Sequence, residues 1–163
     1  MKTKKMVFAT LLITLGLILN IITPGFLGLM KPDFLLAFYL IALCTLDNLQ
    51  EKVIVVMVCA LMSAMTSLMP GAQIANFVEK ILTGISITLI YPRAKSLNNG
   101  FLAVLIGGLG TLLSGFYFLV VMTQLGFIEG SLLPLFMSVV LPTAFINIII
   151  IRMFLKGLRY KFI

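Results

Sequence analysis

Four polar side chains between residues 73 and 80 are the ones best suited to bind a small molecule. Gln73, Asn76, Glu79 and Lys80 lie in a part of the chain where almost every neighbour is apolar. A charged side chain at the centre of a membrane costs roughly 2.5–3.5 kcal/mol on insertion scales, so such residues usually face a partner, a cavity or a ligand. An acid beside a base suits a ligand that carries both charges.

Helical spacing would gather these side chains on one face. Offsets of 3, 7 and 10 residues from Gln73 fall on one stripe of a helix, with Glu79 at the edge of the stripe. Glu79 would lie roughly 9 Å along the helix from Gln73, at a rise of about 1.5 Å per residue. The spacing therefore predicts a pocket below the outer rim of the membrane. The stripe consists of Gln73, Asn76, Lys80 and Thr83.

A structural role would explain the same charges. Lys80 could extend its ammonium group outward, and Glu79 could pair with Lys80 or with Lys31. The motif Lys31-Pro32-Asp33 also has two interpretations. Pro32 suits a first helical position and Asp33 a first turn, or else Asp33 or Lys31 lines the same outer pocket.

Other residues of the outer half are secondary candidates. Asn20 and Tyr117 are included as substrate contacts, although each alone is also typical of a hydrogen bond between helices. Phenylalanines that could wall a cavity for an aromatic ligand are Phe26, Phe34, Phe38, Phe77 and Phe116.

The elements that must position these residues are membrane helices. The chain has 163 residues, of which 61% are hydrophobic and 10% charged, whereas a soluble domain has about 25% charged residues. Apolar stretches predict an all-α integral membrane protein, formed as a single domain over residues 1–163 by six transmembrane helices. The predicted helices span residues 6–22, 33–46, 52–69, 73–91, 100–125 and 131–155.

The basic residues predict the orientation of these helices. With the N-terminus inside, ten of the twelve Lys and Arg residues lie on the inner side, so both termini are expected in the cytoplasm. This asymmetry and anionic lipid explain the net charge of +7 without nucleic acid. The second, fourth and sixth helices then begin at the outer face, where their N-termini favour an anionic group such as a carboxylate.

Several kinds of chemistry have little support in the sequence. There is no histidine, the commonest metal ligand and general base. Cys44 and Cys59 have no metal-binding spacing and are expected to be free thiols. No G-K-[ST] sequence is present, so no nucleotide-binding loop is predicted. We therefore expect neither an enzyme nor a cofactor or metal site.

Small residues in the fifth and sixth predicted helices indicate close packing. Gly107, Thr111 and Gly115 form a ridge of small side chains, as do Gly110 and Ser114. Asn147 is interpreted as a hydrogen-bonding residue between helices. Kinks in the sixth helix are expected from its prolines, Pro134 and Pro142.

The polar motifs resemble one known family. Lys31-Pro32-Asp33 at the second helix, with Pro70-Gly71-Ala72-Gln73, Asn76 and Glu79-Lys80 at the fourth, resembles the tryptophan-specific substrate-binding (S) component of energy-coupling factor (ECF) transporters, the TrpP-like family. The likeness in length, helix number and inward termini covers essentially the whole chain. Family members often have Pro before the Asn and Asp before the Lys, where this chain has Ala75 and Glu79.

The resemblance implies a mechanism. S components bind a nutrient at the outer side of a prokaryotic cell membrane, and then associate with a membrane coupling subunit and two cytoplasmic ATPases. They are thought to topple in the membrane to deliver the substrate. The docking surface often has an A-x-x-x-A-like patch on the first helix. The corresponding positions here are Ala9 and Ile13, with Thr10 and Thr14 as a second small pair.

For a tryptophan ligand, the resemblance and the charges together suggest a role for each residue. Glu79 would bind the ammonium group, with Asp33 as the alternative, and Lys80 with the helix N-termini would bind the carboxylate. Gln73 and Asn76 would fix the orientation, and aromatic rings would hold the indole.

Two other functions remain open from the residues alone. One is a solute carrier driven by a proton or sodium gradient through Asp33 or Glu79. The other is a membrane scaffold or assembly factor whose polar stripe contacts another protein.

Overall fold

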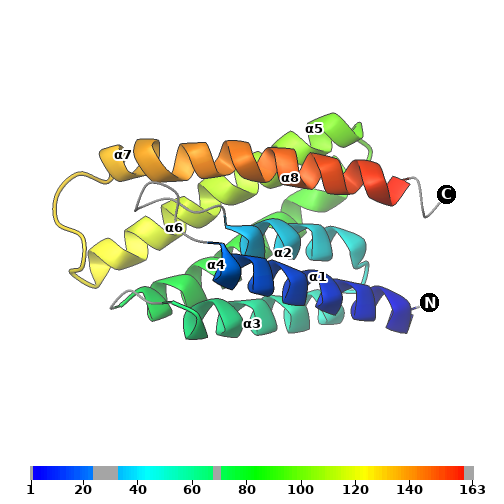
Figure 1. Ribbon diagram of the computed structural model, residues 1–163, viewed down its shortest axis with the longest axis horizontal. Helices are drawn as coiled ribbons and strands as arrows, with labels where there is room; N and C mark the ends of the chain where they lie inside the picture. The colour runs from blue at the N-terminus through cyan, green and yellow to red at the C-terminus, as the bar shows by residue number, and fades with distance from the viewer. Residues whose placement is uncertain (1, 24–32, 68–70, 160–163) are drawn as a thin grey trace.

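The computed structural model describes residues 2–23, 33–67 and 71–159, and these residues form six helical segments. The first four are α1 (Lys2–Ile22), α2 (Phe34–Thr45), α3 (Leu49–Met65) and α4 (Ala72–Ala94). The fifth joins α5 (Asn99–Ala103), η1 (Val104–Leu109) and α6 (Gly110–Gln124). The sixth joins α7 (Leu132–Leu135), η2 (Phe136–Val140) and α8 (Leu141–Arg159). The predicted all-α fold with six helices is confirmed (Figure 1).

The outer surface of the bundle is suited to lipid. Four segments are long and apolar enough to cross a membrane: Thr3–Ile22, Ala72–Ala94, Gly100–Gln124 and Leu132–Gly157. Large apolar side chains such as Leu11, Phe101 and Phe145 are more than 60% exposed on the isolated chain. Exposed apolar surface of this extent is unfavourable in water and favourable in a bilayer.

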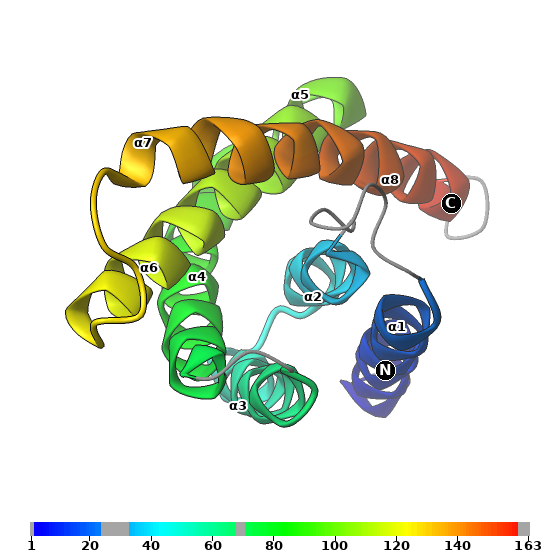
Figure 2. The same ribbon diagram turned by 60° about the vertical axis from the view of Figure 1, so that its left-hand side comes forward.

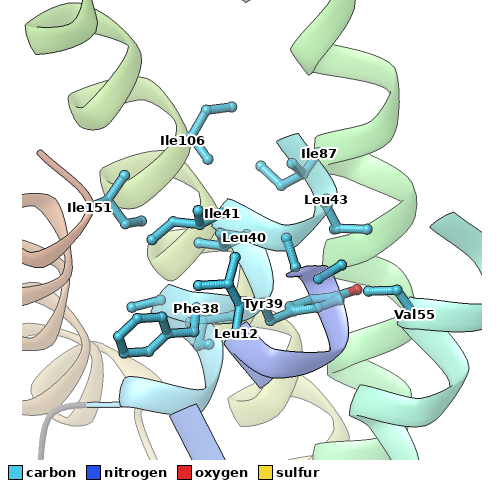
Figure 3. Packing of buried hydrophobic residues seen from close by; sticks show 14 of the residues in the cluster. Leu12, Phe38, Tyr39, Leu40, Ile41, Leu43, Val55, Ile87, Ile106 and Ile151 are labelled. Carbon is cyan, nitrogen blue, oxygen red and sulfur yellow. The ribbon is translucent and has the colours of Figure 1, made fainter. Parts of the chain in front are cut away.

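The short helix α2 is the centre of the bundle. Nine consecutive residues, Leu35–Leu43, are buried, because α1, α3, α4, α6 and α8 all pack around this helix (Figure 2). Side chains from α1, α3, α4, η1 and α8 converge on Phe38, Tyr39, Leu40 and Ile41 (Figure 3). A helix that is apolar on every side is stable only when it is covered in this way.

Asp33 defines where α2 begins. The structure places it at the N-cap, one position before the helix, and not within the first turn as predicted. Its Oδ1 accepts a hydrogen bond of 2.9 Å from the backbone N–H of Leu36. This contact satisfies one of the free N–H groups at the helix start, which is the usual role of an N-cap aspartate.

The fifth and sixth segments pack closely through their small residues. A Cβ atom on Gly107 would lie 3.1 Å from Ile151 Cδ1 of α8, and one on Gly115 would lie 2.4 Å from Val140 Cγ1 of η2. The predicted close packing at these glycines is therefore confirmed. Each segment contains a π-helical turn, and the η2 turn lies between Pro134 and Pro142. Asn147 donates to Thr111 Oγ1 at 2.9 Å, which confirms its predicted role between helices.

Basic residues meet at one end of the bundle, which we call the basic end. Lys5 of α1 bonds Asp47, and Lys95 Nζ lies 3.8 Å from the same carboxylate. The hydrogen bond from Lys5 holds the pKa of Asp47 below its usual range. Lys52 lies over the Tyr91 ring, 5.5 Å from its centroid. The start of α1 and the end of α8 lie at this same end (Figure 1).

Cys44 and Cys59 are free thiols, as predicted.

Candidate functional site

Three charged side chains meet where α2 begins against α4, and we call them the ion cluster. Lys80 Nζ lies 3.1 Å from Asp33 Oδ2 and also donates to Glu79 Oε1. Lys80 and Glu79 are almost completely buried, at 1% and 2% exposure, while the Asp33 side chain is 33% exposed. Asp33 is thus the member of the cluster that a ligand can reach most directly.

Two hydroxyl groups support the cluster from neighbouring helices. Ser114 Oγ of α6 donates to Glu79 Oε2 at 2.5 Å. Tyr39 of α2 donates to the backbone carbonyl of Lys80 at 2.9 Å, and Figure 3 shows its ring extending from α2 toward Val55 of α3. Gly84 makes room for this hydroxyl, because a Cβ atom at that position would lie 2.1 Å from the Tyr39 oxygen. The cluster is therefore fixed by α2, α4 and α6 together.

The cluster lies well inside the bundle. Lys80 is eight residues after the start of α4 at Ala72, which is about 12 Å along the helix axis. The twelve residues of α2 span about 18 Å, much less than the roughly 30 Å of a hydrocarbon core. A helix this short does not span such a core by itself, and the carboxylate at its N-cap has the Lys80 ammonium as a nearby cation.

Among the residues that the structure describes, the charges of the cluster do not balance. Two carboxylates and one ammonium leave a formal net charge of −1 when all three are ionised. An ammonium group carries three N–H donors, and the contacts with Asp33 and Glu79 use two of them. The site therefore offers an excess negative charge to a ligand cation and one further donor to a ligand anion.

The structure does not bring all of the predicted residues into this cluster. Gln73 is exposed and Asn76 half-buried, both nearer the start of α4. Asn20 is half-buried near the end of α1. Tyr117 Oη lies 3.1 Å from Ser86 Oγ, so it links α6 to α4. Lys31 lies outside the described residues.

The outward extension considered for Lys80 is absent, because its ammonium group is buried between Asp33 and Glu79. Sequence reasoning did not predict Ser114 or Tyr39 as partners of the cluster. Ser114 belongs to a ridge of small residues that also serves packing, and Tyr39 lies within an apolar run. Nothing in the sequence distinguishes either residue from its neighbours as a partner of the cluster.

The aromatic candidates are dispersed. Phe38 is buried and packs edge-on against Phe154 of α8, with ring centroids 5.0 Å apart. Phe116 is exposed beside Tyr117, while Phe34 and Phe77 are half-buried. Phe26 lies outside the described residues. A hollow of about 470 Å³ is an apolar groove between the fifth and sixth segments, and none of the candidate site residues lines it.

The predicted docking residues divide between two faces of α1. Ala9 and Ile13 are buried, at 0% and 2% exposure. Thr10 and Thr14 are exposed and border a hollow of about 90 Å³ between α1 and α3, which Ile13 also lines.

In the described part of the chain, no group of three or more acidic, Cys or His side chains could hold a metal ion.

Comparison with known proteins identifies the family. Residues 2–159 match the family model described as tryptophan transporter TrpP. The chain belongs to the TrpP family. The resemblance to this family seen in the polar motifs is therefore confirmed, and the TrpP fold, with its apolar helices, is that of a multi-pass membrane protein.

Relatives of this TrpP family member cover most of its length. A protein of Bacillus subtilis (strain 168) is 35% identical over 91% of this chain and 87% of its own length. Similar proteins of Clostridium acetobutylicum and Clostridium perfringens are 31% and 33% identical, over 92% and 91% of this chain and 88% and 87% of their own lengths. Each is named "Probable tryptophan transport protein". No solved structure matches the chain.

Replacing Lys80 by Met should destabilise the protein by roughly 3–5 kcal/mol, because two carboxylates would lose their buried partner. The double variant Lys80→Met/Glu79→Gln should recover much of this loss, since the remaining carboxylate, Asp33, is partly exposed. Thermal unfolding in detergent, followed by size-exclusion chromatography, would measure both effects. An equal loss of stability in the single and double variants would contradict the pairing of Lys80 with Glu79.

Proposed function

We propose that this TrpP family member is the tryptophan-binding membrane subunit of an ECF-type importer. Membership of a tryptophan transporter family over residues 2–159 carries the proposal. The ion cluster supports it, because its excess negative charge suits the ammonium group of an amino acid and the remaining donor of Lys80 suits the carboxylate. The chain would bind substrate and deliver it, and partner subunits would hydrolyse ATP.

The contacts favour Asp33 as the partner of the substrate ammonium. Both carboxylate oxygens of Glu79 are engaged, one by Lys80 and the other by Ser114, and the side chain is buried. Asp33 is more exposed, and its two oxygens retain lone pairs beyond the contacts with Leu36 and Lys80. In this arrangement Glu79 holds Lys80 in place, and Lys80 offers its remaining donor to the substrate carboxylate.

The start of α4 would complete the polar part of the site. Gly71 caps this helix at φ +74°, without a side-chain hydrogen bond in the described part of the chain, and the N–H groups of a helix start favour an anion. Gln73 and Asn76 lie on the path between this helix start and Lys80. We propose that they orient the substrate as it enters, and that Asn20 and Lys31 also contact it.

The basic end would face the cytoplasm of a prokaryotic cell, since Lys and Arg residues concentrate on that side of membrane proteins. The ion cluster would then open to the outside. We assign docking on the coupling subunit to the face of α1 where Thr10 and Thr14 border the hollow. These small side chains would let a helix of the partner approach closely. Toppling after docking would carry the substrate inward.

A transporter driven by an ion gradient is the second candidate. The excess negative charge of the ion cluster favours it, because a proton or sodium ion on Asp33 would neutralise the site. Carboxylates at membrane depth commonly serve in such relays. The two mechanisms differ in their energy source, and the binding chemistry of tryptophan would be common to both.

Titration with L-tryptophan tests binding directly. The chain contains no tryptophan, so indole emission from the purified protein would come from the ligand alone. We expect a saturable blue shift as the indole enters a dry site, weaker for tyrosine and phenylalanine in competition. A folded protein that gives no shift at any concentration would contradict tryptophan binding.

Charge removal separates the roles of the two carboxylates. Asp33→Asn should raise the Kd for tryptophan roughly 10- to 100-fold, because a charge-assisted hydrogen bond contributes roughly 1.5–3 kcal/mol. Asn is also a good N-cap, so α2 should still form. Glu79→Gln, the matched control, should change the Kd less. A larger increase in the Kd for Glu79→Gln than for Asp33→Asn would instead identify Glu79 as the partner of the substrate ammonium.

Uptake in cells distinguishes the energy source. Radiolabelled tryptophan should accumulate only when this chain is co-expressed with a coupling subunit and its ATPases. An inactivating substitution in the ATPases should abolish uptake. Accumulation by the chain alone that is lost on adding a protonophore would instead establish the gradient-driven mechanism.

A further inference from the structure

Thr83 is a buried hydroxyl group without a partner on the helix face that carries the ion cluster. Its side chain is 0% exposed, and its Oγ1 has no hydrogen-bond partner among the residues that the structure describes. Lys80 and Glu79 lie three and four residues earlier on α4, so the three side chains share one face. A buried polar atom without a partner is unfavourable and is uncommon outside functional sites.

Other hydroxyl groups in these helices show how Thr83 differs. Six of them donate to the backbone carbonyl four residues earlier, which satisfies the hydroxyl without any neighbouring helix. This is seen for Thr10, Thr66, Ser86, Thr111, Thr123 and Thr143. Thr83 does not make the corresponding bond to the Glu79 carbonyl, so its oxygen remains available to a group outside its own helix.

Thr83 also interrupts a series of polar contacts between α4 and α6. One turn earlier, Glu79 accepts from Ser114, and about one turn later, Ser86 contacts Tyr117. Thr83 lies between these two bonded pairs on the same face of α4. Asn147 Oδ1 is another buried acceptor for which the described residues provide no partner, but its amide nitrogen bonds Thr111 at the α6–α8 interface and it is not on the helix of the ion cluster.

We propose that Thr83 Oγ1 accepts the indole N–H of tryptophan and so determines the specificity of the site. The inference rests on the proposed function. With the ammonium at Asp33 and the carboxylate at Lys80, an indole directed along α4 toward the basic end reaches Thr83 one helical turn away. The indole nitrogen only donates, and needs an acceptor when buried. The side chain of phenylalanine has no such donor and would leave Thr83 unpaired, which disfavours its binding.

The test compares L-tryptophan with 1-methyl-L-tryptophan, which lacks the N–H, in matched variants. The wild type should bind tryptophan about fivefold more tightly or better, as expected for one hydrogen bond. Thr83→Val keeps the branched shape and should bind both ligands equally. Thr83→Ser should retain the preference, as should the control Thr123→Val, whose hydroxyl bonds the carbonyl of Leu119.

Thermal stability without ligand gives an independent readout. Thr83→Val should not lower the Tm, because it replaces an unsatisfied hydroxyl with a methyl group; a clear loss would indicate a structural role and overturn the proposal. A ligand preference that persists in Thr83→Val would place the acceptor elsewhere, as at Asn147. Equal binding of both ligands by the wild type would exclude an N–H acceptor and leave tryptophan binding intact. Binding of neither ligand would refute the proposed function itself.

Discussion

The pairing of Lys80 with two carboxylates is the interaction on which the architecture depends. The central helix α2 has only twelve residues, so its N-cap carboxylate ends inside the bundle, where an isolated charge is costly. Lys80 offsets that charge from α4, and Glu79, held by Ser114, fixes Lys80 from the other side. The cluster therefore ties α2, α4 and α6 together at the depth where the apolar packing of α2 begins.

The same cluster connects stability with binding. One carboxylate paired with Lys80 would hold the helices together equally well. Replacing a buried ion pair by well-packed apolar side chains often makes a protein more stable. Within the described residues, this site retains one carboxylate in excess and one Lys80 N–H beyond its two contacts. Its most exposed member, Asp33, also caps the central helix. In the proposed function, a substrate zwitterion completes the charges, so occupancy of the site and the start of α2 are coupled through a single side chain.

The two ends of the bundle differ in their chemistry. At the basic end, Lys5, Asp47 and Lys95 join three parts of the chain by exposed contacts, which contribute little stability individually. At the start of α2, the charged groups of the ion cluster have defined partners, and two of the three are buried. This division suits a TrpP transporter, because surface charge orients a membrane protein, whereas buried polar groups with defined partners select a ligand.

The sequence by itself determined the membrane class, the six helices, the family and most of the polar residues of the cluster. Helix formation in a membrane depends on local hydropathy and on backbone hydrogen bonds within each segment, so each span could be predicted from its own residues. Only the tertiary structure decided that Asp33 meets Lys80, 47 residues away, and that Ser114 supports Glu79. It also decided that the Thr83 hydroxyl has no hydrogen-bond partner in the described part of the chain. These contacts depend on how the helices pack around α2, and side-chain spacing along a single helix carries no information about the residues of another.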